Sequence, residues 1–600
     1  MATILTTAGA LLGFQALAVI GAVPASAVTS CTYNPATDTI NITIDPNGAA
    51  YVAVESADDL DAESPVGAIL FTPSGVFPPN FDPDTNSAQC GSATVSNTTQ
   101  IVVLGSPSGA EFFGIDEQTA VGGEPGTFPS TISWAVDLGG AAGDEFEIDL
   151  DDDTDNNVVL TDTSFSLNGG TGELVGVELI QIFGEAGDDT LDASAVSANV
   201  EADLFGGAGD DWIAPGAFDG DAVSGDADSD TLSYGTRTTS VAVVNGVDAG
   251  LDANGDGDND DVGDEEDLID CFETVVTGSG NDTIDDAACG DSTYVPGDGD
   301  DDITGDATDV LDWSTSSAAM TIDPANGTAT GQGTDTFTGI TSFIGSAFDD
   351  VLLWDGTTTF FSGGDGTDTV DASATTTSNV IDLDTLDGTP VTGVGAPVDD
   401  LENAIGGSAN DTLTGNDRQN RLEGRDGDDA LVGAAGNDLL LGGNGNDTYT
   451  GGAGADTVSF ASSPNGVEVD MNLGFATGEG DDGFGDTIET VVGSDHDDSI
   501  TGGGGVVAIN FRFIGRAGDD LLTGSGSNDT LRGGGGSDVL RGVNGDDNLR
   551  GGKGNDRLFG GSGVDVGNGG KGKDVCKGVE IKSSCGTKKS PKAPVTRQRL

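Results

Sequence analysis

One large apolar residue recurs every nine positions in two stretches of the chain. Residues 406–459 divide without insertion into six nonapeptides, GGSANDTLT, GNDRQNRLE, GRDGDDALV, GAAGNDLLL, GGNGNDTYT and GGAGADTVS. Residues 515–577 divide into seven more, GRAGDDLLT, GSGSNDTLR, GGGGSDVLR, GVNGDDNLR, GGKGNDRLF, GGSGVDVGN and GGKGKDVCK. A lone apolar residue between polar neighbours predicts a very short strand with one inward side chain.

The inward residue stands at position 8 of the unit. It is Leu413, Leu422, Leu431, Leu440, Tyr449 and Val458 in the first block, then Leu522, Leu531, Leu540, Leu549 and Leu558 in the second. Such short strands form a core only when they stack in parallel, at about 4.8 Å per rung. The glycines between them permit the positive φ of tight turns. The pattern therefore predicts an all-β fold, a parallel β-roll or β-solenoid of Gly-Asp-rich nonapeptide coils.

Single units and longer relatives of them occur upstream. GEAGDDTLD begins at 184, GGAGDDWIA at 206, TGSGNDTID at 277, PGDGDDDIT at 296, GGDGTDTVD at 363 and GSDHDDSIT at 493. Residues 307–353 and 455–501 share a scheme of strand, Gly-rich turn and I/V-rich strand. We interpret them as longer coils of one solenoid, with separate small domains as the alternative. Residues 28–150 lack the nonapeptide but contain alternating runs such as TINITI, which predict a β-rich N-terminal region.

The two unbroken nine-residue registers resemble the RTX, or hemolysin-type, calcium-binding repeat family, whose consensus is G-G-x-G-x-D-x-U-x. In that family two nonapeptides form one coil, and Ca²⁺ lies between the turn of repeat i and that of repeat i+2. The resemblance implies calcium ligands at the Asp of position 6. These are Asp411, Asp429, Asp438, Asp447, Asp456, Asp520, Asp529, Asp538, Asp547, Asp556, Asp565 and Asp574, with Asp189, Asp211, Asp282, Asp368 and Asp498 in the scattered units. The alternative is that the Asp-Gly runs are solvated flexible loops.

Several positions depart from the consensus. The unit GNDRQNRLE has Asn420 at position 6 and Arg418 at position 4, so arginines are expected to replace calcium charge there. Gly567 and Cys576 occupy position 8 in the last two units, where the core should taper. The arginines at position 9 are expected to point outward and to pair with nearby carboxylates; they are Arg532, Arg541 and Arg550. DANGDGDND (252–260) begins like an EF-hand loop but has Gly263 where that loop needs Glu, so an extra calcium loop and a plain acidic loop remain open.

Composition makes calcium the natural partner. The chain has 98 Gly, and its 104 Asp and Glu against 20 Lys and Arg give a net charge of −84. Such a chain repels itself when compact, and it lacks the basic surface that nucleic acid requires. Multiple Ca²⁺ ions, which prefer oxygen ligands, would neutralise it.

The chain divides into seven predicted segments: a signal peptide (1–27) ending in Ala25-Ser26-Ala27, the β-rich region (28–150), a degenerate RTX-like β-solenoid (151–405), tandem block 1 (406–459), a longer-coil connector (460–514), tandem block 2 (515–577), and a disulfide cap with a basic tail (578–600). The signal peptide predicts secretion, with an apolar structural segment as the alternative. Six cysteines fit an oxidising compartment and are predicted to pair as neighbours: Cys31 with Cys90, Cys271 with Cys289, and Cys576 with Cys585.

The residues favour a non-enzymatic role. The single histidine, His496, cannot form the H-E-x-x-H motif of zinc proteases, and no G-x-S-x-G occurs. We therefore predict a secreted calcium-binding repeat protein whose β-roll folds on binding Ca²⁺, with a structural or surface-interaction role and no membrane span. A cell-surface polymer or another extracellular protein is the expected partner. The alternatives are a β-helix enzyme of the polysaccharide-lyase kind and a calcium-dependent adhesin.

Overall fold

The computed structural model describes residues 30–34, 39–43, 49–54, 68–72, 88–94, 100–104, 112–116, 133–138, 145–150, 156–167, 170–197, 199–217, 222–238, 240–245, 268–269, 272–286, 290–386, 401–485, 488–503 and 509–586. Two compact units contain them: Met1–Ser233 with Val247–Phe272, and Tyr234–Gly246 with Glu273–Leu600. Their secondary structure is almost entirely strand, with the four-residue helix α2 (Leu383–Leu386). None of the helices in these ranges is long and apolar enough to span a bilayer.

The first unit contains short strands that pair mostly in parallel. One sheet has the order β20-β17-β15-β13-β9-β7-β3-β4-β5, formed by β20 (Leu268–Ile269), β17 (Ala222–Ala227), β15 (Glu201–Ala208), β13 (Leu179–Phe183), β9 (Glu145–Asp149), β7 (Phe112–Asp116), β3 (Ala49–Val54), β4 (Ala68–Thr72) and β5 (Ala88–Thr94). The other strands follow the order β1 (Ser30–Asn34), β2 (Thr39–Thr43), β6 (Gln100–Leu104), β8 (Ser133–Asp137), β12 (Gly170–Val175), β11 (Ser164–Leu167), β10 (Asn157–Thr161), β14 (Thr190–Ala195), β16 (Trp212–Ala214) and β18 (Thr231–Ser233). The predicted β-rich N-terminal region is confirmed.

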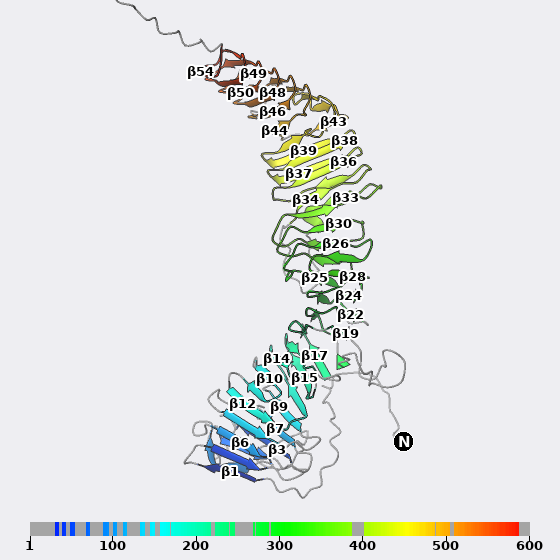
Figure 1. Cartoon of the computed structure of the whole chain (residues 1–600), viewed down its shortest axis with the longest axis vertical. Coiled ribbons are helices and arrows are strands. Elements are labelled where there is room, and N and C mark those ends of the chain that lie inside the picture. Colours follow the sequence, from blue (N-terminus) through cyan, green and yellow to red (C-terminus); the bar gives the residue numbers. More distant parts are fainter. Residues whose placement is uncertain are drawn as a thin grey trace, which may run out of the picture. The chain divides into compact units, whose positions relative to one another are not determined.

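The second unit contains an 18-stranded and a 12-stranded sheet, whose strands stack rung on rung (Figure 1). The 18-stranded sheet comprises β19 (Ala242–Asn245), β22 (Thr283–Asp286), β24 (Asp302–Thr304), β26 (Thr321–Asp323), β27 (Thr328–Thr330), β28 (Thr334–Thr338), β30 (Val351–Leu353), β32 (Asp368–Asp371), β34 (Leu401–Ile405), β36 (Arg421–Asp426), β38 (Leu439–Asn444), β40 (Thr457–Ser459), β44 (Thr490–Val492), β46 (Arg512–Ala517), β48 (Thr530–Gly535), β50 (Asn548–Lys553), β52 (Val566–Lys571) and β54 (Ile581–Ser583).

The 12-stranded sheet comprises β33 (Val380–Asp382), β35 (Thr412–Thr414), β37 (Ala430–Gly436), β39 (Thr448–Gly454), β43 (Asp481–Phe484), β42 (Phe475–Thr477), β41 (Glu468–Asp470), β45 (Ser499–Thr501), β47 (Leu521–Thr523), β49 (Val539–Asn544), β51 (Arg557–Ser562) and β53 (Val575–Lys577). Further strands pair in the order β21 (Thr274–Val276), β23 (Thr293–Val295), β25 (Val310–Asp312), β29 (Ser342–Ile344) and β31 (Phe360–Ser362). In block 1 consecutive strands alternate between the two large sheets, so two nonapeptides complete one coil.

The position-8 residues form the core, as the sequence predicts. Leu413 pairs in register with Leu431, and Leu431 with Tyr449, each 18 residues further along the chain. Leu422, Leu440 and Val458 repeat this in the other sheet. The leucines are fully buried and Tyr449 is 1% exposed. The parallel β-solenoid is confirmed.

The longer coils differ from the nonapeptide coils by an antiparallel insertion. In residues 307–353, β26, β27 and β28 form an antiparallel meander whose outer strands pair in parallel with β30 and β24. The strands β41, β42 and β43 repeat this in residues 455–501. The extra residues therefore widen the coil within the same sheets.

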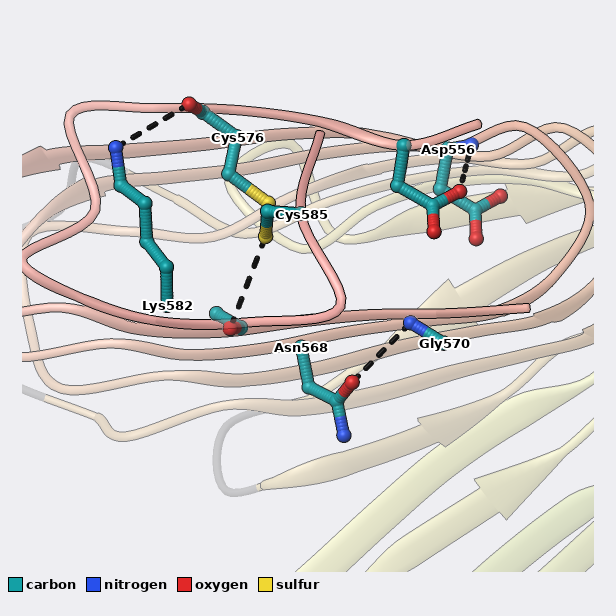
Figure 2. Close-up of a disulfide and its surroundings, with 8 residues drawn as sticks. Asp556, Asn568, Gly570, Cys576, Lys582 and Cys585 are labelled. Carbon is teal, nitrogen blue, oxygen red and sulfur yellow. Dashed lines mark hydrogen bonds between the residues drawn. A yellow bond between two sulfur atoms is a disulfide. The ribbon is translucent and has the colours of Figure 1, made fainter. Parts of the chain in front are cut away.

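The last described coil is closed covalently. Cys576 and Cys585 form a disulfide, with their Cα atoms 5.7 Å apart (Figure 2). The Lys582 ammonium donates to the Cys576 carbonyl, 3.3 Å away. Where Gly567 leaves the inward position empty, Val579, 3% exposed, lies against it, and a Cβ on Gly567 would come within 2.8 Å of the valine. The core thus tapers as expected.

Candidate metal sites in the turns

Nearly every turn of the roll places one acid two residues before the inward residue; the exception in block 1 is Asn420. In the turn 442–447, Gly443 (φ 104°) and Gly445 (φ 135°) take the left-handed backbone that glycine favours. They also allow a close approach, since a Cβ on either would overlap the backbone of the preceding coil at Arg425 and Gly427. The chain then enters the strand with Asp447 buried.

The buried acids form ladders along the roll. Asp411 N–H donates to Asp429 Oδ1 (2.7 Å), Asp429 N–H to Asp447 Oδ1 (2.9 Å), and Asp447 N–H to Asp482 Oδ1 (3.0 Å). The same link joins the other columns, including Asp438 to Asp456, Asp520 to Asp538, Asp538 to Asp556, Asp529 to Asp547, Asp547 to Asp565, and Asp189 to Asp211. One carboxylate oxygen of each rung is therefore satisfied by the peptide of the rung before it.

The second oxygen of most rungs has no partner. Oδ2 is buried and makes no hydrogen bond in Asp301, Asp429, Asp438, Asp447, Asp456, Asp482, Asp520, Asp538, Asp547, Asp556, Asp565 and Asp574. An unsatisfied buried oxygen costs about 1–3 kcal/mol, and more when charged. A row of such atoms needs a positive partner between the coils.

The burial shifts the acids toward their neutral form. Desolvation raises the pKa of Asp520 to about 8, and carboxylates of the neighbouring turns add to this shift. It raises the pKa of Asp438, Asp447 and Asp547 to about 7, again with help from nearby like charges. Without a cation, these carboxylates repel one another at neutral pH.

Main-chain carbonyls share the space of the unpartnered oxygens. A Cβ on Gly433 would contact Asp438 Oδ2 and lie 2.6 Å from the Gly451 carbonyl oxygen of the next coil. A Cβ on Gly542 would contact Asp547 Oδ2 and lie 2.7 Å from the Gly560 carbonyl oxygen. Glycine at position 1 thus leaves room beside one carboxylate and one carbonyl oxygen, the ligand types that hard Ca²⁺ prefers.

The acids of different turns do not gather into side-chain clusters. Within the described residues, no group of three or more His, Cys, Asp or Glu side chains is placed to hold a metal ion. A cation site here would therefore combine a few carboxylate oxygens with turn carbonyls, which is within the six to eight oxygen ligands that Ca²⁺ takes. The residues present fit calcium on this ground.

Three predicted ligands differ from the rest. Oδ2 of Asp411 accepts a hydrogen bond from Gly407 N–H (2.6 Å), that of Asp498 from Ser494 N–H (2.8 Å), and that of Asp529 from Ser525 N–H (2.5 Å). Their carboxylates are thus satisfied within their own turns.

Sequence reasoning missed the glutamates that complete the ladders. Glu402, Glu489 and Glu580 accept from Asp368 N–H, Asp456 N–H and Asp565 N–H, each at 2.9 Å. None stands in a nonapeptide, so the nine-residue register does not reveal them. The signal in the sequence is an acid two residues before a residue whose side chain lies in the core, as Glu489 precedes Val491.

A second, exposed ladder was also missed. The side chains at position 5 accept from the peptide of the next coil: Asp428 N–H donates to Asn410 Oδ1 (3.0 Å) and Asn446 N–H to Asp428 Oδ1 (2.8 Å). Asn510, Asn528 and Asp546 repeat this in block 2. The frequent Asn or Asp at position 5, just before the consensus Asp, was the signal.

The arginines behave in two ways. In block 1, Arg418 lies 3.2 Å from Glu402 and Arg421 lies 2.7 Å from Glu423. In block 2, the expected pairing of Arg532, Arg541 and Arg550 was wrong, because none of them forms an ion pair with any described residue. The carboxylates nearest to them along the chain are buried in the turns, pointing away from the outer face.

Other predictions lie outside the described residues. These are the signal peptide, the 252–260 loop, the Cys271–Cys289 pair, the basic tail beyond residue 586 and the side chains of Cys31 and Cys90. His496 is exposed within the turn 493–498.

Comparison with known proteins agrees with this geometry. The family of RTX calcium-binding nonapeptide repeats matches residues 181–195, 405–440, 423–458, 512–540 and 541–576. These ranges cover both nonapeptide blocks except for the last residue of each, and they include the turn of Asp189. No curated protein matches the chain in sequence.

Proposed function

We propose, from the premise that residues 181–576 contain RTX calcium-binding nonapeptide repeats, that this is a secreted protein whose β-roll folds when it binds Ca²⁺. The observation that carries the proposal is the row of buried, unpartnered Asp Oδ2 atoms facing turn carbonyls. Bound Ca²⁺ would supply the positive charge that this row lacks. The binding free energy would then become folding free energy, because the unfolded chain has no such sites.

The turn residues have distinct parts in this proposal. The Oδ1 atoms bind the preceding rung and hold each carboxylate in one orientation. The Oδ2 atoms and carbonyls such as that of Gly451 would bind the ion. The Leu side chains at position 8 exclude water from the interior. Low cytosolic calcium would leave the blocks unfolded until export.

The folded roll would have a structural or surface-interaction role without catalysis. The outer face of block 2 is cationic: the exposed acids of residues 509–586 are Asp519, Asp546 and Glu580, whereas the exposed bases are Arg512, Arg516, Arg532, Arg541, Arg550, Lys553, Arg557, Lys571, Lys573, Lys577 and Lys582. An anionic cell-surface polymer is the class of partner that this face fits.

Circular dichroism of the purified chain tests calcium-coupled folding. We expect a cooperative gain of β signal on titration with Ca²⁺, and none with Mg²⁺, which resists dehydration and demands octahedral geometry. Asp547→Asn should raise the Ca²⁺ midpoint. Asp546→Asn removes the same charge from an exposed neighbour and should leave the midpoint unchanged. A β spectrum that is complete in chelator and unmoved by Ca²⁺ would contradict the proposal and favour a constitutive solenoid.

A further inference from the structure

Most turns fall into two classes that differ at position 4. In the first class, called open turns, position 4 is a glycine with positive φ; these are Gly187, Gly209, Gly299, Gly366, Gly427, Gly436, Gly445, Gly454, Gly518, Gly536, Gly545, Gly554, Gly563 and Gly572. In the second class, called closed turns, it is Phe348, Ala409, Arg418, His496 or Ser527, and none of these has a positive φ. The closed turns are 345–350, 406–411, 415–420, 493–498 and 524–529.

The class decides what the acid of the turn contacts. In the open turn of Gly299 and in every open turn from Gly427 onward, Oδ2 of the Asp two residues after that glycine is buried and makes no hydrogen bond. In every closed turn the corresponding oxygen accepts the N–H of position 2, as in Ser494 to Asp498 and Ser525 to Asp529. The turns of Asp282 and Asp482 belong to neither class, because the glycines at position 4, Gly280 and Gly480, have no positive φ.

In several closed turns the side chain at position 2 forms additional hydrogen bonds with the side chain at position 6. Ser494 Oγ donates to Asp498 Oδ1 (2.7 Å), and Ser525 Oγ lies 3.0 Å from Asp529 Oδ2. In the turn 415–420, Asn416 N–H donates to Asn420 Oδ1 (2.8 Å). Asn420 Nδ2 donates to the Leu401 carbonyl (3.3 Å), so position 6 of this turn has an amide in place of the acid, and both ends of that amide are hydrogen-bonded. Hydrogen-bond donors of the chain thus occupy the oxygen that an open turn leaves bare.

A column is the set of turns that one ladder of hydrogen bonds joins. Three closed turns are each the first turn of their column. Asp411, Asp498 and Asp529 are each followed in their column by an open turn, at Asp429, Asp520 and Asp547. On their other side the ladder begins with a residue that is not acidic: Asn379, Val467 and Phe511. In these three columns the first turn has no preceding turn to share a cation with, and its acid is capped internally. The column that begins at Asn156 differs, because its first turn is the open turn of Asp189.

From these contacts we infer that the closed turns bind no calcium and act as cation-independent caps, while the open turns hold the ions. This inference rests on the proposed calcium function and narrows it. Asp411, Asp498 and Asp529 are then structural residues, although the nonapeptide pattern assigns them to the metal. The residue at position 4 distinguishes the classes in the sequence, and four of the five closed turns also have Ser or Asn at position 2.

The number of Ca²⁺ ions bound per full-length chain, measured by equilibrium dialysis, tests the inference. Asp547→Asn, in an open turn, should lose at least one ion relative to the unmodified chain. Asp529→Asn, in the closed turn next to it in the same column, should lose none. The double variant Ser525→Gly with Ser527→Gly changes the closed turn to GGGGND and should gain an ion.

The outcomes separate the two proposals. If the unmodified chain binds no Ca²⁺, the proposed function fails. If it binds Ca²⁺ and Asp529→Asn loses as many ions as Asp547→Asn, the inference alone is overturned. Should Asp547→Asn fail to fold, the double variant decides, because it adds a site: a gain supports the inference and an unchanged number overturns it.

Discussion

At the scale of single residues, backbone conformation limits what each turn position accepts. Position 2 has positive φ in all the open turns except that of Gly299, yet it is occupied by Glu185, Arg425, Ala434, Arg516 and Val543 in five of them. A left-handed conformation costs an L-residue about 1–2 kcal/mol, and a β-branched side chain is the least suited to it. Val543, with φ 87° and 41% exposure, has this cost without a compensating burial.

Val543→Gly should therefore stabilise the calcium-loaded roll. We expect the free energy of unfolding to rise by about 1 kcal/mol. This is the cost of the left-handed conformation that glycine removes, reduced by the extra conformational entropy that glycine gives the unfolded chain. Val566→Gly is the matched control: Val566 is similarly exposed, at 40%, but lies in β52 without positive φ, and glycine should destabilise that strand. Denaturant unfolding measures both, and equal shifts would contradict the explanation.

At the scale of elements, the outer faces of block 2 differ from the rest of this acidic chain. Arg532 on β48 pairs in register with Arg550 on β50, so two guanidinium groups lie on neighbouring rungs. On the other sheet Phe559 lies between Arg541 and Lys577 in register, with Arg557 5.6 Å and Lys577 5.9 Å from its ring centroid. Exposed charges without counter-charges favour an anionic partner.

We expect the calcium-loaded protein to bind a sulfated dextran column through the exposed cationic side chains of block 2. Replacing Arg532, Arg541 and Arg550 by Gln should lower the salt concentration of elution, because these cations are unpaired and screened by salt. Replacing Arg418, Arg421 and Arg425 by Gln removes the same charge from block 1, where two of the three are paired with Glu. This control should elute nearly as the unmodified protein does. Equal shifts of the two variants would show that only net charge matters.

At the scale of the whole molecule, the net charge of −84 opposes compaction. Much of this repulsion is concentrated where the acids stack. Burial raises the pKa of Asp429 and Asp538 to about 6 and that of Asp520 to about 8. Protons and calcium are therefore alternative ways to neutralise the same ladders, and they compete.

The pH dependence in chelator should follow from these shifts. The folded-state pKa lies above the ordinary Asp value of about 4, so folding takes up protons. The stability from protonation is fully present below about pH 4 and is lost as pH rises through the folded-state values of about 6 to 8. Without calcium, β signal should increase on lowering the pH from 8 to 5; with calcium, it should be present at pH 8. A calcium-free chain that loses β signal on acidification would contradict this assignment.

The sequence by itself determined the repeating features of this protein. The inward residue at position 8 and the acid at position 6 depend only on the alternation of a short strand and on a fixed turn length, and both are local. Leu413, Leu431 and Leu549 are buried in register for this reason. That two nonapeptides form one coil was implied by the resemblance to the RTX repeat family, and the pairing of residues 18 apart confirms it.

The tertiary structure alone decided what each acid contacts. Asp529 and Asp547 both stand at position 6, and only the structure showed that Oδ2 of Asp529 accepts an N–H of its own turn whereas Oδ2 of Asp547 makes no hydrogen bond. Glu402, Glu489 and Glu580 join the ladders through neighbours more than ten residues away in sequence. A hydrogen bond between coils depends on which segments stack, and insertions such as β41–β43 change that without altering the local pattern.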